Sequence, residues 1–177
     1  MIALTETHST RMAYARVAGF TFIFYIAAGI FSMSLPDGSP MADALGLLLN
    51  LSALVLGVTL YMITREQAPA LALLALTCRA LEAVHEESAI FFSIGSLFFC
   101  WLLLRGRLIP VALAWLGVIA SALLVVLLPL QLASMLTNMN WSDSVTWLVW
   151  LPMLVFELVF AFWLMFKGVA DSKTVIA

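Results

Sequence analysis

The sequence has few charged residues: 10% of its 177 residues are Asp, Glu, Lys or Arg, against about 25% in ordinary soluble domains. Hydrophobic residues make up 64% of the chain. Too little polar surface remains to cover a water-soluble core, so a soluble fold is excluded. The composition predicts an all-α integral membrane protein, because a helix satisfies its own backbone hydrogen bonds inside lipid.

Basic clusters and catalytic motifs are also absent. The formal net charge is -2, and no basic run or basic amphipathic helix occurs, so nucleic acid is not expected as a partner. The sequence has no nucleophile elbow, phosphate-binding loop or Cys-x-x-Cys pair, so it predicts no catalytic residue and no cofactor. Cys78 and Cys100 lie within apolar runs, and we expect both to be buried free thiols.

Long apolar runs are present instead. A helix that crosses a hydrocarbon layer of about 30 Å needs roughly 20 residues, and six runs have this length or nearly so. They are 13–35, 43–64, 69–86, 88–105, 109–130 and 145–167. We therefore expect a six-transmembrane-helix bundle over residues 13–168, preceded by an N-terminal arm (1–12) and followed by a C-terminal tail (169–177).

The third and fourth runs form one long apolar stretch with a polar interruption. Residues 69–104 are too many for a single crossing helix. Glu86, Glu87 and Ser88 interrupt this stretch, so we expect a tight hairpin between two spans at that point.

The basic residues predict the orientation of the bundle. One side of a six-span arrangement collects Arg11, Arg16, Arg65, Arg105, Arg107, Lys167 and Lys173. Basic residues accumulate in cytoplasmic loops, so both termini are predicted to be cytoplasmic. Trp141, Trp147 and Trp150 lie near the other interface, where aromatic residues are common.

An ionisable cluster lies inside the third span. Arg79, Glu82 and Glu86 fall within about 60° of a helix circumference, with His85 at the edge of this arc. Arg79 and Glu157 both lie about 15 Å from the cytoplasmic end of their spans. A lone charge at this depth costs about 2.5–3.5 kcal/mol on insertion scales. We therefore expect Arg79 to pair with Glu82 and also with Glu157, which would bring the third and sixth spans together.

The role of this cluster has two interpretations. A buried ion pair can serve only to fix the register of two helices. Ionisable residues inside a membrane also frequently mark a functional site. Asn50, an amide in the middle of the second span, is a further polar residue that should need a partner.

Metal binding is a weaker interpretation of the same residues. Glu82-Ala83-Val84-His85 matches the Glu-x-x-His pattern that carboxylate metal sites in helical bundles use in pairs. Only one copy is present, so no metal site is predicted. Glu82, His85 and Glu86 are the candidate ligands if a metal does bind.

Three segments of the chain resemble a known family. They are Cys78-Arg79-Ala80-Leu81-Glu82-Ala83, the segment Ser96 to Pro110, and Leu151-Pro152-Met153-Leu154-Val155-Phe156-Glu157 with Trp163 and Lys167-Gly168 beyond it. The opening Ala15-Arg16-Val17-Ala18-Gly19 fits too. These segments are similar to the bacterial membrane family catalogued as domain of unknown function 4386. The resemblance implies a bacterial inner (plasma) membrane protein in which Arg79, Glu82 and Glu157 recur, and it implies no activity.

Three functions remain open. We prefer a non-enzymatic bundle that binds a lipid, a small apolar ligand or a partner protein around its polar cluster. The alternatives are a small proton-linked transporter, in which the carboxyls of two three-span halves titrate, and an intramembrane metal-dependent enzyme. The expected partners are the lipid bilayer, a partner membrane protein, or a second copy of the chain that packs along Gly46, Asn50 and Gly57. The residues of the predicted polar cluster are Arg79, Glu82, His85, Glu86, Glu157 and Asn50.

Overall fold

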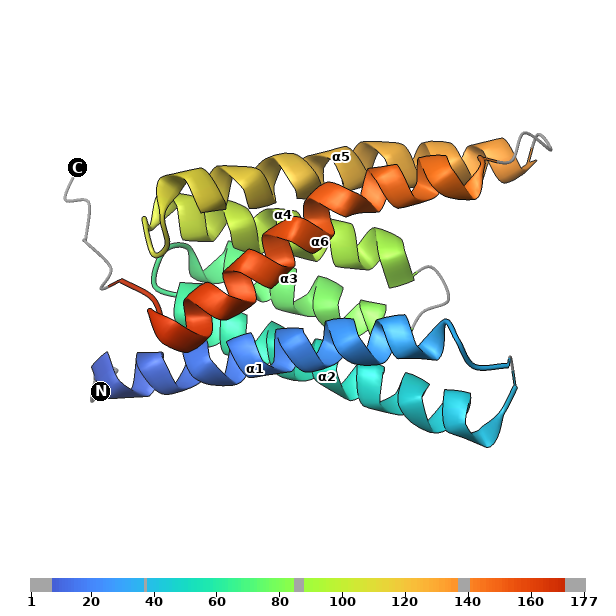
Figure 1. Ribbon diagram of the computed structural model, residues 1–177. Coiled ribbons are helices and arrows are strands. Elements are labelled where there is room, and N and C mark those ends of the chain that lie inside the picture. Colours follow the sequence, from blue (N-terminus) through green and yellow to red (C-terminus); the bar gives the residue numbers. More distant parts are fainter. Residues whose placement is uncertain (1–7, 37, 85–87, 137–140, 171–177) are drawn as a thin grey trace.

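The computed structural model describes residues 8–36, 38–84, 88–136 and 141–170. These residues form helices joined by short turns and loops (Figure 1). The helices are α1 (His8–Ser32), α2 (Pro40–Thr64), α3 (Pro69–Glu82), α4 (Ser88–Arg105), α5 (Val111–Leu136) and α6 (Asp143–Phe166). The predicted all-α fold is confirmed for this part of the chain.

Proline marks the start of three helices. Pro40 and Pro69 occupy the first positions of α2 and α3, where a missing N–H costs nothing, and Pro110 directly precedes α5. Ser39 caps α2, because its Oγ accepts a hydrogen bond from the backbone N–H of Ala42 at 3.2 Å. These signals explain why the predicted helix starts lie within a few residues of the observed ones.

Helix length distinguishes two groups of elements. Within the described residues, α1, α2, α5 and α6 are long and apolar enough to cross a membrane. The 18 residues of α4 extend about 27 Å and the 14 residues of α3 only about 21 Å. The chain is therefore a helical protein with four apolar candidate spans, and the count of six spans stays a prediction.

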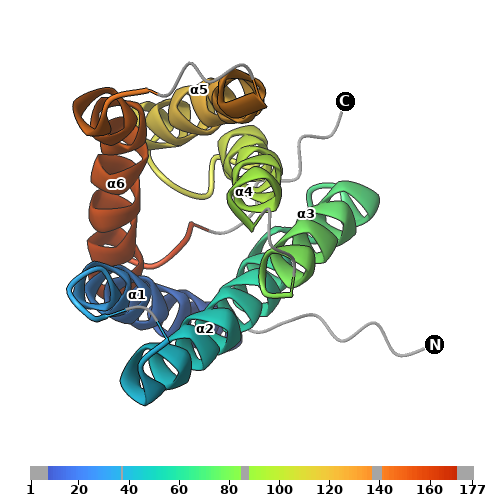
Figure 2. The ribbon, with the colours of Figure 1, turned by 90° about the vertical axis from the view of Figure 1, so that its right-hand side faces the viewer.

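The helices form a closed ring in which each packs on its neighbours in sequence. α6 completes this ring by packing on both α5 and α1. Seen from one end of the bundle, α6 runs along one side from α5 to α1 (Figure 2). It therefore crosses the bundle diagonally, beside α5 at its N-terminal end and beside α1 at its C-terminal end (Figure 1).

The contact between α1 and α6 depends on a glycine. A Cβ atom added at Gly19 would lie 2.7 Å from the backbone oxygen of Ala161 and 2.7 Å from Cγ of Met165. Only glycine permits the two helices to approach this closely. Near this crossing, the ring of Phe160 makes an edge contact with Phe22 at 5.6 Å between centroids.

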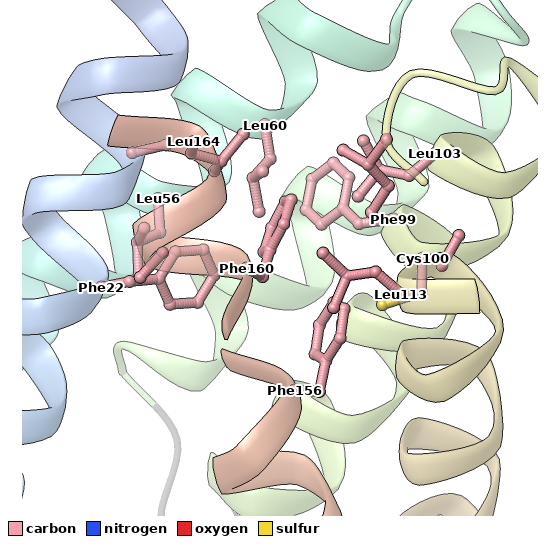
Figure 3. Packing of buried hydrophobic residues seen from close by; sticks show 14 of the residues in the cluster. Phe22, Leu56, Leu60, Phe99, Cys100, Leu103, Leu113, Phe156, Phe160 and Leu164 are labelled. Carbon is pink, nitrogen blue, oxygen red and sulfur yellow. The ribbon is translucent and has the colours of Figure 1, made fainter. Parts of the chain in front are cut away.

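Aromatic and aliphatic side chains fill the interior of the ring. Phe156 and Phe160 stack at 5.2 Å between centroids, and Leu56 and Leu60 of α2 lie among the same group (Figure 3). Cys100 is also part of this core. Both cysteines are buried and free, which confirms the prediction made for them.

The outer surface of the bundle is apolar. Large hydrophobic side chains point away from the core on every long helix; Leu47 of α2, Leu148 of α6 and Phe166 of α6 are 62%, 67% and 75% exposed. A surface of this kind suits contact with lipid tails. The structure thus agrees with the membrane class that the composition predicts.

The end of α3 differs from the sequence-based expectation. The third span was expected to continue to residue 86, but α3 ends at Glu82, and the backbone N–H of Val84 turns back to the carbonyl of Leu81 at 3.1 Å. No glycine or proline marks this end, so residue pattern alone could not locate it. α3 and α4 do pack as neighbours, as the hairpin prediction requires, although residues 85–87 lie outside the described part.

Polar contacts join the helix ends at the end of the bundle where α1 begins and α6 ends (Figure 1). Arg11 is buried, donates to the carbonyl of Ile63 at 3.2 Å, and forms an ion pair with Glu66 at 3.3 Å. These contacts join the start of α1 to the end of α2. The backbone N–H of Ala170 donates to the carbonyl of Leu108 at 2.9 Å, which ties the segment after α6 to the α4–α5 connection.

Candidate functional site

Arg79 and Glu82 form an ion pair on α3. They are three residues apart and so lie one above the other on the same helix face. Nη1 of Arg79 lies 2.7 Å from Oε2 of Glu82. Arg79 is 1% exposed and Glu82 6% exposed, so both charges are inside the bundle. The sequence-based prediction of this pair is confirmed.

Glycines on two neighbouring helices make room for Arg79. A Cβ atom at Gly57 of α2 would lie 2.9 Å from Cβ of Arg79, and one at Gly95 of α4 would lie 3.5 Å from its Cδ. The guanidinium carbon lies 5.0 Å from the ring centre of Phe92, close enough for a cation–π interaction. Arg79 is thus held between α2 and α4 and cannot leave the interior without moving a helix.

The guanidinium group is close to Glu82 but poorly aligned with it. None of its three nitrogen atoms has a hydrogen-bond partner among the described residues, although Nη1 is in ion-pair contact with Glu82. A buried guanidinium normally uses several of its five N–H groups. The cluster therefore keeps unused hydrogen-bonding capacity in its interior.

Tyr25 adds a phenol to the cluster from α1. Its hydroxyl donates to Oε1 of Glu82 at 3.2 Å. Glu82 thus has Arg79 at one oxygen and Tyr25 at the other, and the contact connects α1 to the end of α3. Tyr25 was not among the predicted residues of the cluster. A phenol in the middle of an apolar run needs a hydrogen-bond partner, and this was the signal that could have identified it.

Glu157 of α6 lies inside the bundle without a partner of its own. It is 6% exposed, and its Oε1 atom accepts no hydrogen bond from the described residues. The predicted ion pair of Arg79 with Glu157 is wrong: in the described part of the chain, the ion pair of Arg79 is the one with Glu82. The physical reason is that α3 packs on α2 and α4, whereas α6 packs on α5 and α1, so the two helices do not touch there.

A cavity of about 480 Å³ adjoins the carboxylates. Its walls are residues of α1 from Tyr25 to Ile30 with Met33 just after α1, and residues of α6 from Thr146 to Glu157. Glu82 at the end of α3 and Phe92 on α4 also line it. The diagonal course of α6 explains its position. α6 leaves α1 beyond the Gly19 contact (Figure 1), and α3 ends at Glu82, which itself lines the cavity.

Polar and apolar groups are segregated within the cavity. Glu82, Glu157 and the phenol of Tyr25 are at its inner end. Toward the C-terminal end of α1 and the N-terminal end of α6 the walls are mostly apolar and aromatic; they include Trp147 and Trp150, and Thr146 is the polar residue there. Mostly apolar pockets with a few convergent polar groups are typical of small-molecule sites.

The aromatic residues of the cavity were not predicted as site residues. The sequence analysis assigned Trp147 and Trp150 to the membrane interface. In the structure both line the cavity, and the ring of Trp150 lies 5.8 Å from that of Phe92. The spacing of the two tryptophans along α6 gives no indication that a cavity lies beside them, because that depends on the tilt of the helix.

Asn50 lies away from the other predicted site residues. It is exposed on α2 and does not line the cavity. The three residues proposed for a contact with a second copy, Gly46, Asn50 and Gly57, do not share one exposed face. Gly57 is buried against Arg79 and Leu76, whereas a Cβ atom at Gly46 would meet nothing within 4 Å.

The sequence predicts no metal site, and this expectation stays a prediction. Among the described residues, no group of three or more His, Cys, Asp or Glu side chains is placed to hold a metal ion. Of the candidate ligands, Glu82 is part of the ion pair described above, and His85 and Glu86 lie outside the described residues.

Together these features define an α-helical membrane protein with an open, mostly apolar cavity that has buried carboxylates along one part of its wall. Residues 85–168 match the family model described as Domain of unknown function (DUF4386). The resemblance stated from the sequence is confirmed for this segment, which includes α4, α5 and Glu157 on α6. No curated protein and no solved structure matches the chain.

Proposed function

We propose that the protein is a non-enzymatic membrane bundle that binds a small apolar ligand in the cavity between α1 and α6. The observation that supports this proposal is a cavity of about 480 Å³ that has two buried carboxylates at its inner end. Sites for small molecules have volumes of about 300–1,000 Å³ and a similar combination of apolar walls and few polar groups. The carboxylates would fix the orientation of the ligand, and the apolar walls would supply most of the affinity.

The test uses two glycines with open space around them. A Cβ atom at Gly29, which lines the cavity, meets nothing within 4 Å, and the same is true of Gly46 on the outer side of α2. Gly29→Trp should fill the cavity, and Gly46→Trp is the matched control. The measurement is mass spectrometry of small molecules that copurify with each variant in nanodiscs.

We expect one class of small molecule with the wild type and with Gly46→Trp, and its loss from Gly29→Trp. Equal retention by both variants would contradict the proposal, as would the absence of any bound molecule from the wild type. If phospholipid is the only molecule lost from Gly29→Trp, the ligand of the cavity is a lipid and not a small molecule.

We further propose that the protein lies in the bacterial inner membrane with both termini in the cytoplasm. Support comes from basic residues in or next to the helix segments at the end of the bundle where α1 begins and α6 ends (Figure 1). They are Arg11, Arg16, Arg65, Arg105, Arg107 and Lys167.

Self-association is proposed for the outer face of α2. Asn50 is exposed there between large apolar side chains, with Leu47 at 62% and Leu51 at 51% exposure. An amide in lipid gains a hydrogen bond when it meets the same amide of a second copy. Crosslinking in native membranes should therefore give a dimer that Asn50→Leu weakens, and an unchanged dimer yield would rule out this contact.

Proton-linked transport is a second candidate function. One observation favours it: Glu82 and Glu157 line the same cavity, and each comes from the third helix of its half of the chain. Proteoliposomes with an internal pH indicator would test it. A substrate-dependent proton flux that Glu157→Gln abolishes would support transport, and ligand binding without any flux would support the binding function.

A further inference from the structure

Among the described residues, the charges around the cavity do not balance. The described residues supply one cation, Arg79, and two carboxylates, Glu82 and Glu157, all at most 6% exposed. Arg79 is in ion-pair contact with Glu82, and it does not itself line the cavity. Glu157 is therefore the carboxylate without a counter-charge in direct contact, and it faces the empty space.

The hydrogen-bonding groups left at the inner end of the cavity are acceptors. The hydroxyl proton of Tyr25 is used in the bond to Oε1 of Glu82. Oε1 of Glu157 has no donor, although this side chain is more than nine-tenths buried. A buried acceptor left without a donor costs about 1–3 kcal/mol. A ligand that brings a donor would remove this cost.

The aromatic walls favour a positive charge as well. Trp147, Trp150 and Phe92 line the cavity, and the faces of aromatic rings attract cations. The ring of Phe92 already makes such a contact with Arg79, whose guanidinium carbon lies 5.0 Å from the ring centre. Carboxylate and aromatic groups together form the kind of site that protein structures use for amines and related cations.

We propose that the ligand of this cavity is an apolar molecule with one protonated amine, whose N–H group donates to Oε1 of Glu157. The inference rests on the proposed function, because it assigns the chemical class of the same ligand. A single positive charge would make the cluster neutral, with Arg79 and the ligand balancing the two glutamates. An ionised fatty acid would add a third negative charge to the site, and repulsion disfavours its binding.

The experiment compares three probes with the same chain: decylamine, decanol and decanoate. Binding to the wild-type protein in nanodiscs is measured at neutral pH by native mass spectrometry, with empty nanodiscs of the same lipid as the control for partition into lipid. We expect decylamine to bind at least about tenfold more tightly than decanol, and decanoate not to bind above the control level. This comparison needs no variant of the charged cluster.

Two variants separate the charge inference from the proposed function. Glu157→Gln keeps the shape of the side chain and should reduce decylamine binding about tenfold while leaving decanol binding nearly unchanged. Gly29→Trp should abolish binding of both probes. If decanol binds as tightly as decylamine and Gly29→Trp abolishes both, the cavity is a binding site and the charge inference is wrong. If Gly29→Trp leaves binding of every probe unchanged, or if no probe binds, both proposals are wrong.

Discussion

Arg79 is a charged side chain held inside the bundle by one carboxylate, one aromatic ring and the space that two glycines leave. Its ion pair with Glu82 was predictable, because the two residues are three apart on one helix. The pairing with Glu157 was predicted from equal depth in the membrane and is wrong, because depth says nothing about position around the ring. The contact of Tyr25 with Glu82 likewise depends on which helices are neighbours.

The two glutamates should differ in their effect on stability. Glu82→Gln leaves the charge of Arg79 buried without its counter-ion and should lower the free energy of unfolding by about 3–5 kcal/mol. Glu157→Gln removes an oxygen that has no hydrogen-bond partner, so the expected change is within about 1 kcal/mol. Unfolding in mixed detergent micelles, followed by circular dichroism, measures both values. Equal losses for the two variants would show that Arg79 depends on Glu157 as much as on Glu82.

At the scale of the helices, starts were easier to predict than ends. Pro40, Pro69 and Pro110 mark starts in the sequence, whereas the end of α3 at Glu82 has no such mark. The early end of α3 and the tilt of α6 leave the space that becomes the cavity. Neither feature is visible in hydrophobic periodicity, and this is why the residues of the polar cluster were predicted and the cavity beside them was not.

The crossing of α1 and α6 gives a prediction at this scale. Gly19→Ala places a methyl group 2.7 Å from the carbonyl oxygen of Ala161, so α1 and α6 must move apart, at a cost of about 1–3 kcal/mol. Gly29→Ala, on the same helix, meets nothing within 4 Å and should be neutral or stabilise α1 by about 0.5–1 kcal/mol. Thermal unfolding of the two variants in one detergent is the measurement. A Gly19→Ala variant as stable as Gly29→Ala would mean that this contact does not determine the position of α6.

At the scale of the whole molecule, the order of the six helices around the ring follows their order in the chain. The composition predicted the membrane class and the helical fold, and the breaks between apolar runs predicted the number of helices. What the sequence left open was the closing contact of α6 with α1, because it joins the two ends of the chain. Such a contact has no signature in local sequence.

The predicted orientation can be tested with new cysteines, because both native cysteines are buried. Ser142 precedes α6, is exposed, and its side chain caps no backbone N–H, while Ala170 follows α6 and is exposed. In intact cells, a membrane-impermeant maleimide should label Ser142→Cys, and it should label Ala170→Cys only after the membrane is made permeable. Labelling of the two positions from the same side would show that α6 does not cross the membrane. The reverse pattern would place the termini outside the cytoplasm.

The order of groups along the cavity has a consequence for how a ligand would lie in the membrane. Tyr25 is seven residues from the end of α1, which is about 10 Å below the rim, and the walls above it are apolar. A bound amphiphile would therefore be upside down relative to the surrounding lipid, with its polar group deepest and its hydrocarbon part toward the headgroups. A phospholipid in this position would bury its charged headgroup beside Glu82 and Glu157, which costs desolvation free energy. The order of groups along the cavity thus favours solutes with one small polar group.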